Sequence, residues 1–557
     1  MKVLFINSKE KSFWEEEIDL EGILDLSIFL HLEKYKSYRG DVFSSKNVIV
    51  IGTSHLNFPG AQRATVVFRS PLHGGINSAT LGGFGEFIKR AGYSAIVIEG
   101  KGEDTFLLIK DEKVKFIHLE PSNNIFSVEK KLYAKFKSHY NGIPFRIMLI
   151  GSGSKNTNYG CLVSSKPQEI GKVMSVAGRG GVGSVLYKAH GIVGIAIGGK
   201  AKFNLDLDAS IVKEQMLFTK KYREEGTFLA NYLQLKENVI SFNGMSTFLP
   251  SPERLKLFEK FIKQKLLKDY KFKSETCGEY CIAVCKKLEK DKKVDYECVH
   301  ANGPFLGIFE RKYAVFLAHL VNDLGIDAIY LGYVLGAVFE ALSKGLISPS
   351  YFELKKSPSL DWKKPTSKIN FEVAKELIYK IGLGKIPLLG NNLRQSVKKL
   401  KIQDLAIYLP HGKDLDITPP FYWSLGVMLP VVFQGKFFSD YSISFEQPET
   451  YAKICAERTI KEYIFDNLSI CRFQRGWIEK KFGKESLEKA KNWIKKAWKF
   501  KKSAKALPQF WESKRTLELV NNFFKEFGKG EWKEGGIEKL KEYWKTWQKT
   551  YLNTLDI

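Results

Sequence analysis

The chain has 557 residues, 44% of them hydrophobic and 27% charged, so it can bury large cores and is neither a disordered chain nor a small disulfide-stabilised one. Its formal net charge of +26 fits a solvated, lysine-rich surface or attraction to an acidic partner, either an electron carrier or nucleic acid. Because MKVLFINSKEKSFWEEE shows no secretory leader and no apolar stretch could span a bilayer, we expect a cytoplasmic protein with reduced cysteines.

The first 200 residues predict a β-rich domain. Short apolar runs between turn residues are typical of strands, and they occur at Val48–Ile51, Ala64–Phe68, Ala95–Ile98, Thr105–Ile109 and Arg146–Ile150. Glycine is dense between them, as in LGGFG at 81–85 and GRGGVG at 178–183. These glycines fit either the turns of a β-domain or close approach of the backbone to a ligand.

From about residue 204 the pattern becomes helical. Apolar residues recur at spacings of three and four in segments 209–235, 252–270, 308–345 and 370–383. Pro252 in SPER predicts a helix start. The fold class is therefore α+β, with a β-rich domain at 1–203 followed by mainly helical domains at 204–400 and 401–557.

A basic stretch near 385–402, which we expect to be rich in turns, leads into the final helical region. That region is rich in lysine and aromatic residues, as in Lys495–Phe500 and Thr546–Tyr551. Aromatic residues at helical spacing are more often core contacts than platforms for bases. We therefore expect no nucleic-acid partner.

Three of the seven cysteines, Cys277, Cys281 and Cys285, lie close together, and Cys471 follows far downstream. Four thiolates are the ligand set of a [4Fe–4S] cluster. In one continuous helix Cys277 and Cys285 would be ~12 Å apart, so the segment must bend, and Gly278 best allows this. Spacing alone leaves a zinc site, a radical-SAM cluster and buried thiols open. The other cysteines are predicted core residues: Cys161, Cys298 and Cys455.

Six segments, in the same order, resemble the tungsten-containing aldehyde ferredoxin oxidoreductase family. They are QRATVVFRSPLHGGINSATLGGFGEFIKRAGYSAIVIEGKGE at 62–103, VAGRGGVGSVLYKAHGIVGIAI at 176–197, CGEYCIAVC at 277–285, DYECVHANGPFLGI at 295–308, NDLGID at 322–327 and DNLSIC at 466–471. Their order through residues 62–471 identifies the chain as a divergent member of that family.

The resemblance implies that the β-rich domain carries tungsten, or alternatively molybdenum, held by two molybdopterins, with Mg²⁺ between their phosphates and a neighbouring [4Fe–4S] cluster on the four cysteines. Glu297 matches the family's active-site glutamate, a general acid or base whose pKa burial would raise. The residues implied to face the pterin cofactor are Arg63, Thr80, Gly82, Ala177, Gly178, Arg179, Gly180, Asn322, Gly325, Asp327, Asp466 and Ile470.

Several positions depart from the family pattern. Three residues rather than two separate Cys277 from Cys281. Asn322 stands where the family has Asp, Ser469 where it has Gly, and Thr80 where it commonly has an Asn whose backbone helps to hold magnesium. A role through the backbone survives the last change.

The family's substrate-side motifs are absent from residues 409–438. The family's histidine falls near Lys436, which we expect to be a surface lysine. His411 is the only histidine in this region, and we expect it in an exposed loop. The aromatic residues that could form a changed pocket are Phe421, Tyr422, Trp423, Phe433 and Phe437.

The leading hypothesis is an enzyme that oxidises an aldehyde to a carboxylic acid and passes electrons to ferredoxin or a similarly acidic carrier. One alternative keeps these cofactors but acts on an aromatic or bulky substrate within a complex. Another is a non-catalytic paralogue that transfers electrons or serves as a scaffold. A homo-oligomer or a larger complex is compatible with all three.

Overall fold

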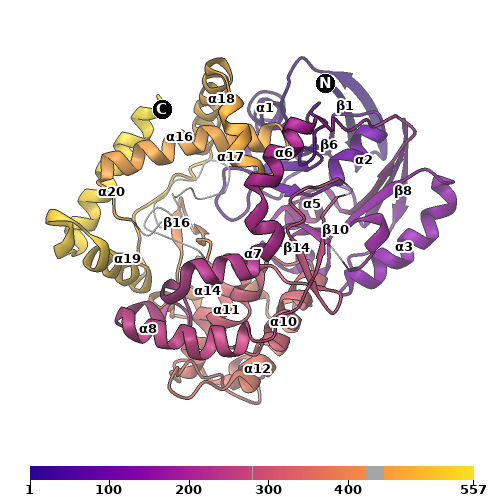
Figure 1. Cartoon of the computed structure of the whole chain (residues 1–557). Helices are drawn as coiled ribbons and strands as arrows, with labels where there is room; N and C mark the ends of the chain where they lie inside the picture. The colour runs from indigo at the N-terminus through magenta and orange to yellow at the C-terminus, as the bar shows by residue number, and fades with distance from the viewer. Residues whose placement is uncertain (173, 279, 422–443) are drawn as a thin grey trace.

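The computed structural model describes residues 1–172, 174–278, 280–421 and 444–557. Its first 200 residues form two six-stranded sheets, and the rest of the described chain is mainly helical (Figure 1). The predicted α+β class is therefore confirmed. The division at residues 203 and 400 stays a prediction, and one continuous buried cluster joins residues from all three ranges.

The first sheet has the strand order β2-β1-β6-β3-β4-β5, with only β1 and β6 parallel. Its strands are β1 Lys2–Asn7, β2 Ser12–Glu17, β3 Ile49–Gly52, β4 Ala64–Arg69, β5 Ile76–Leu81 and β6 Ala95–Glu99. Alternate residues of β6 face opposite sides of the sheet. Val97 joins the large helical core, while Ile96 and Ile98 face the second sheet. Apolar burial on both faces explains why these runs are continuous rather than alternating.

The second sheet has the order β11-β10-β9-β12-β7-β8, with β7 and β12 parallel. Its strands are β7 Thr105–Lys110, β8 Lys113–His118, β9 Phe145–Leu149, β10 Leu162–Ser165, β11 Met174–Ala177 and β12 Ile192–Gly198. The edge strands β5 and β11 lie against each other. The backbone N–H of Gly82 donates a 2.6 Å hydrogen bond to Ser175 Oγ, so this junction brings the end of β5 to β11.

Short helices complete the β-rich region. They are α1 Ile23–Phe29, α2 Phe84–Arg90, α3 Ile125–Tyr140, α4 Ser152–Asn156 and α5 Val182–His190. Helices α2 and α5 contribute to the buried cluster shared by the two sheets. The glycine-rich loop 178–181 therefore leads directly into a helix that is anchored by buried side chains.

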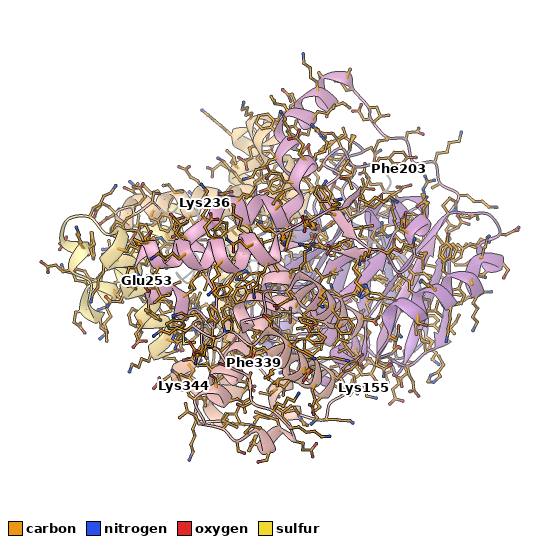
Figure 2. All side chains as sticks on the ribbon, turned by 60° about the horizontal axis from the view of Figure 1, so that its bottom comes forward. Lys155, Phe203, Lys236, Glu253, Phe339 and Lys344 are labelled. Atoms are coloured by element: carbon orange, nitrogen blue, oxygen red, sulfur yellow. The ribbon has the colours of Figure 1, made fainter. Side chains whose placement is uncertain are left out.

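The central region contains α6 Ala209–Phe218, α7 Lys220–Leu235, α8 Ser251–Leu257, α9 Tyr296–Ala301, α10 Arg311–Asp323, α11 Ala328–Ser343, α12 Ser367–Gly382, α13 Pro387–Gly390 and α14 Leu393–Lys399. Small hairpins come from β13 Lys273–Glu275, β14 Lys286–Glu289 and β15 Lys292–Lys293, and from β16 Leu409–His411 and β17 Leu415–Ile417. Figure 2 shows Phe339 of α11 among packed side chains, with Lys344 at the end of that helix.

The helical segment 308–345 contains two helices, α10 and α11, and Asp327 caps the start of α11 by accepting hydrogen bonds from the N–H groups of Ile329 and Tyr330. One detail differs from the sequence prediction. The stretch 385–402 is helical rather than rich in turns. Leu393 and Val397 are buried four residues apart, which stabilises one helical turn against the core.

The C-terminal region is built from α16 Pro448–Asn467, α17 Arg475–Ile478, α18 Lys484–Ser503, α19 Lys514–Phe527 and α20 Ile537–Thr554. The rings of Trp547 and Tyr551 are buried and stacked, with centroids 5.1 Å apart. Their predicted role as core contacts is confirmed. No helix in the described part of the chain has the length and apolar character needed to cross a membrane.

The expectation that His411 is exposed was wrong. His411 ends β16 and is fully buried, with its ring 6.2 Å from that of His73. Burial lowers the pKa of His411. The pairing of β16 with β17 draws this residue inward, which a single histidine in a polar stretch did not reveal. Lys436 lies outside the described residues.

A buried ion pair joins the central and C-terminal regions. Both Nη atoms of Arg515 on α19 donate to the carboxylate of Glu340 on α11, at 2.9 and 2.7 Å. Glu340 also accepts a hydrogen bond from Asn243. Because both charges are withdrawn from water, removal of one partner leaves the other without compensation.

Replacing Arg515 by Met is expected to lower the free energy of unfolding by about 3–5 kcal/mol, since Glu340 then remains as a buried unpaired charge. Lys514→Met is the matched control, because the neighbouring Lys514 side chain is 70% exposed. Guanidinium unfolding measures both variants. Equal unfolding midpoints for Arg515→Met and the wild type would contradict the importance of this ion pair.

Candidate functional site

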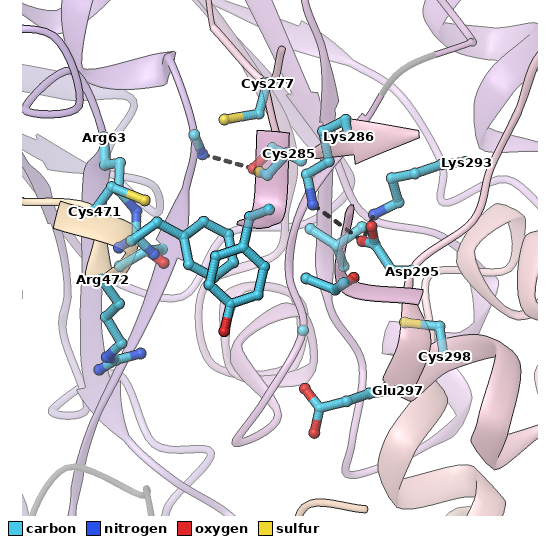
Figure 3. Close-up of a pocket in the computed structure, with 18 of the residues that line it drawn as sticks. Arg63, Cys277, Cys285, Lys286, Lys293, Asp295, Glu297, Cys298, Cys471 and Arg472 are labelled. Carbon is cyan, nitrogen blue, oxygen red and sulfur yellow. Dashed lines mark hydrogen bonds and ion pairs between the residues drawn. The ribbon is translucent and has the colours of Figure 1, made fainter. Parts of the chain in front are cut away.

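A cavity of about 630 Å³ lies between the β-rich region and the helical regions. Its wall combines the ends of β5 and β11, part of α7, the loop 277–285, the start of α11 and residues 471–473. This volume is typical of sites for organic ligands. Figure 3 shows side chains from both sides around a shared open centre.

Most of the residues predicted from the sequence meet at this cavity. Twelve line it: Arg63, Thr80, Gly82, Gly178, Arg179, Cys277, Cys281, Cys285, Glu297, Asn322, Asp327 and Cys471. The other five do not line it: Ala177, Gly180, Gly325, Asp466 and Ile470. The fold therefore brings to one cavity residues that lie more than 400 positions apart in the chain, such as Arg63 and Cys471, as the motif resemblance implied.

The residues behind the wall support those that line it. The Asp466 carboxylate accepts hydrogen bonds from Ser78 Oγ at 2.5 Å and from Arg472 Nη2 at 3.1 Å, and Arg472 lines the cavity. The Ile470 carbonyl accepts a hydrogen bond of 3.2 Å from Arg63 Nη1. These two residues therefore position cationic side chains in the structure.

The four predicted cluster cysteines all line the cavity. Figure 3 shows Cys277, Cys285 and Cys471, and Cys281 lies close enough to these three to interact electrostatically with them. Burial raises the pKa of the Cys281 thiol, and negative charge on the other three sulfurs raises it further. Burial likewise raises the pKa of Cys285 to about 12. The described residues contain no group of three or more His, Cys, Asp or Glu side chains placed to hold a single metal ion. An iron–sulfur cluster instead takes one thiolate at each of four irons.

The loop that carries the first three cysteines joins β13 to β14 and is not helical in its described residues. The predicted bend is thus confirmed, although Val284 adopts the left-handed backbone at φ 39°. Gly278 instead allows close packing. A Cβ on Gly83 would lie 2.4 Å from Gly278 Cα, and one on Gly82 would lie 2.3 Å from Cys277 Sγ. Only glycine permits this approach.

Glu297 on α9 lies at the opposite end of the view in Figure 3 from Cys277. Its half-buried side chain lines the cavity. Burial raises the pKa of Glu297 to about 7, and Arg179 opposes the rise while Asp327 and Asp295 add to it. A carboxyl group with this pKa can accept or release a proton near neutral pH.

Asp327 and Arg179 form an ion pair beside the cavity, and each has a buried polar atom without a hydrogen-bond partner. Asp327 Oδ1 caps α11, whereas its buried Oδ2 has no hydrogen-bond partner and lies 3.8 Å from Arg179 Nε. Arg179 Nη2 donates to the carbonyl of Thr418, but its buried Nη1 has no partner. Buried polar groups are seldom left unpaired, so this acceptor and donor fit a polar ligand in the cavity.

Sequence reasoning missed a buried charge cluster formed by Lys286, Asp295 and Lys293. The two ammonium groups lie 3.0 and 2.9 Å from Asp295 Oδ2 (Figure 3). Although burial opposes it, these lysines lower the pKa of Asp295. Lys286 directly follows Cys285, and Asp295 is the first residue of the DYEC segment. This closeness to predicted site residues is the sequence signal that could have revealed both residues.

Two further predictions can be assessed. Cys161 and Cys455 are buried core residues as expected, but Cys298 was wrongly assigned because it is half-buried and lines the cavity. Phe421 stacks on Tyr333 with centroids 4.7 Å apart and does not line the cavity. The rest of the suggested aromatic pocket lies outside the described residues.

Comparison with known families identifies the class of protein. The family model of the aldehyde ferredoxin oxidoreductase N-terminal domain matches residues 3–199, and that of domains 2 and 3 matches residues 210–529. The chain therefore belongs to the aldehyde ferredoxin oxidoreductase family, and it is an oxidoreductase of that kind.

Individual relatives extend this result. An uncharacterized protein of Methanocaldococcus jannaschii is 32% identical over 100% of this chain and 99% of its own length. The glyceraldehyde-3-phosphate:ferredoxin oxidoreductase of Pyrococcus furiosus is 29% identical over 92% of each chain. The tungsten-containing aldehyde ferredoxin oxidoreductase of Pyrococcus furiosus is 27% identical over 61% of this chain and 57% of its own.

One solved structure shows the same fold. The active site complex BamBC of benzoyl coenzyme A reductase with 1,5-dienoyl-CoA matches with a TM-score of 0.66 and 15% identity. The match covers 100% of this chain and 98% of that chain. At this identity the likeness concerns the fold alone.

Gly82→Ala is expected to displace Cys277, because the added Cβ would lie 2.3 Å from its sulfur. The variant should bind less iron per chain than the wild type after anaerobic purification. Gly483→Ala is the control, since a Cβ there meets no atom within 4 Å. Unchanged iron content in Gly82→Ala, measured against protein concentration, would refute this packing argument.

Proposed function

We propose that this enzyme oxidises an aldehyde to a carboxylic acid at a tungsten–bis(molybdopterin) centre beside a [4Fe–4S] cluster, with ferredoxin as the electron acceptor. The observation that carries the proposal is that four thiols and a glutamate with a raised pKa line one cavity. The relative named glyceraldehyde-3-phosphate:ferredoxin oxidoreductase, by its name, couples an aldehyde to ferredoxin. Molybdenum would fit the same site.

The residues present fit these groups. Cys277, Cys281, Cys285 and Cys471 supply the four soft sulfur ligands that an iron–sulfur cluster requires. The thiolates would hold the cluster at the end of the cavity formed by the loop 277–285. Because Cys471 comes from the C-terminal region, the cluster would join that region to the central one.

The pterins would occupy the wall formed by the β-rich region. Gly178 leaves room for close approach of a ligand to the backbone, whereas the space beside Gly82 is taken by Cys277. Asp327 Oδ2 can accept a hydrogen bond from an amino group. Arg63 and Arg179 offer guanidinium groups to phosphate. The backbone at Thr80 would help to hold Mg²⁺. The change from the family's Asn to Thr does not prevent this, because the role does not require the side chain.

Glu297 is the residue that we assign to proton transfer. When bound, the metal–pterin centre would supply two-electron oxidation and the cluster would pass the electrons on singly. An aldehyde and water together yield a carboxylic acid, two protons and two electrons. With its pKa raised to about 7, the Glu297 carboxylate can accept a proton from the attacking water near neutral pH and then release it.

Anaerobically purified protein is expected to contain tungsten, or molybdenum in its place, together with about four irons per chain if the cysteines hold one [4Fe–4S] cluster. Elemental analysis by mass spectrometry measures both. Iron without tungsten or molybdenum would instead support a non-catalytic electron-transfer paralogue. With the metals present, failure of any aldehyde to reduce ferredoxin or a viologen would support a different substrate.

The value of kcat/KM should rise with pH through about 7 and then level off, because the fraction of Glu297 in its basic form increases through that range. Glu297→Gln should abolish this rise and lower kcat/KM by about 10²–10⁴-fold. Asp323→Asn is a suitable control, since burial raises the pKa of Asp323 to about 6 but this residue does not line the cavity. A normal pH profile in Glu297→Gln would remove the assignment.

A further inference from the structure

The C-terminal end of α6 exposes three consecutive apolar side chains. Met216 is 48% exposed, Leu217 69% and Phe218 42%. We call these three residues the α6 patch. Figure 2 shows α6 rising from the body of the molecule beyond Phe203. Consecutive exposed apolar residues of this size commonly mark a contact surface for another molecule.

Positive charge borders the α6 patch. Helix α6 packs on α17, and residues 213–221 and 479–484, which include the patch and the segment that follows α17, contain six lysines and two glutamates. The Lys480 ammonium lies 5.6 Å from the centre of the Phe218 ring. Both Lys480 and Lys481 are exposed. An acidic partner would be attracted to this rim, and the attraction would weaken as salt is added.

Contacts beneath the patch lead directly to Cys471. Phe218 packs on Gly476, where an added Cβ would lie 2.2 Å from Phe218 Cδ1. Gly476 lies five residues after Cys471 in the chain. Gln215 Nε2 donates a 2.7 Å hydrogen bond to the carbonyl of Pro59, and the next carbonyl, that of Gly60, accepts a 2.8 Å hydrogen bond from the N–H of Cys471.

Aromatic packing reinforces this connection. The rings of Tyr222, at the start of α7, and Phe473 stack with centroids 4.2 Å apart, and both residues line the cavity. Ile211 of α6 packs on the buried cluster that contains Ile470 and Trp477. Helix α6, which carries the exposed patch, therefore packs on two segments. They are residues 59–60, which accept a hydrogen bond from the N–H of Cys471, and residues 470–477, which contain Cys471.

We propose that the α6 patch and its lysine rim dock an acidic, ferredoxin-type electron carrier. The proposal rests on the proposed function, because it assumes a cluster at Cys471. In the docked pair one electron leaves this cluster and one enters the iron–sulfur centre of the carrier, and no bond is made or broken. A small apolar patch with a charged rim suits the short-lived complexes that electron carriers form.

Charge also favours an acidic carrier over a second copy of this chain as the molecule that binds the α6 patch. A second copy of this chain carries the same net charge of +26, and the same lysine rim would face itself across a two-fold contact. Like charges placed opposite each other disfavour such an interface. An acidic carrier meets the rim with opposite charge and leaves the apolar centre of the patch to exclude water.

Two matched pairs of variants test the docking site. Leu217→Gln removes apolar surface from the patch, and Leu346→Gln makes the same change at a leucine that is 61% exposed elsewhere. Lys480→Glu reverses one rim charge, and Lys363→Glu makes the same reversal at another exposed lysine. Binding of a purified acidic [4Fe–4S] ferredoxin to the anaerobic holoenzyme is measured by biolayer interferometry at several salt concentrations.

We expect Leu217→Gln to raise the Kd about fivefold and Lys480→Glu to lower the association rate about tenfold at low salt. Both controls should stay within about twofold of the wild type, and all four variants should keep the wild-type iron content and melting temperature. The salt dependence of association should be weaker in Lys480→Glu.

The proposal is overturned if the iron-loaded wild type does not bind the ferredoxin, or if the patch variants bind it as tightly as their controls. It is also overturned if Leu217→Gln converts a dimer into a monomer in light scattering, because the patch would then join two copies of the chain. No aldehyde is used, so these outcomes are independent of turnover. Absence of tungsten, molybdenum and iron would instead count against the proposed function.

Discussion

The site depends on one unusually close approach between two stretches of backbone. Gly82 and Gly83 at the end of β5 meet Cys277 and Gly278 at distances that leave no room for a Cβ atom. Arg146 secures the contact through a 3.0 Å hydrogen bond from Nη2 to the carbonyl of Cys277. The β-rich region thereby sets the position of Cys277, the first cysteine of the loop between β13 and β14. The cavity lies between this loop and the ends of β5 and β11.

Charge is distributed unevenly around the cavity. The described residues that line it include six cationic side chains, Arg63, Arg179, Lys286, Lys293, Arg472 and Arg475, and three acidic ones, Asp295, Glu297 and Asp327. Behind the wall, Glu462 pairs with Arg472 and Arg475, and Asp466 pairs with Arg472, which reduces this surplus. The positive charge that remains is costly without anions nearby. Pterin phosphates and an anionic iron–sulfur cluster are the kinds of group that would offset it. The same surplus favours the ionised form of Asp295, whereas burial keeps Glu297 easier to protonate.

Local sequence patterns predicted five of the strands and most helices, because turn glycines and apolar periodicity are properties of neighbouring residues. The resemblance to family motifs predicted twelve of the residues that line the cavity. These sequence predictions failed where burial depends on distant packing. His411 is buried by strand pairing, Cys298 faces the cavity beside Glu297, and Asp466 supports Arg472 from behind the wall. Lys286 and Lys293 were not singled out from the sequence, because their shared partner, Asp295, becomes apparent only in the fold.

The two oxygens of Asp327 have different tasks, and this has a thermodynamic consequence. Oδ1 secures the first turn of α11, while the buried Oδ2 has no hydrogen-bond partner, and the residue lines the cavity. A ligand that donates a hydrogen bond to Oδ2 would hold the carboxylate in the orientation that caps the helix. Since α11 runs through the large buried core, ligand occupancy and the resistance of this core to local opening are linked.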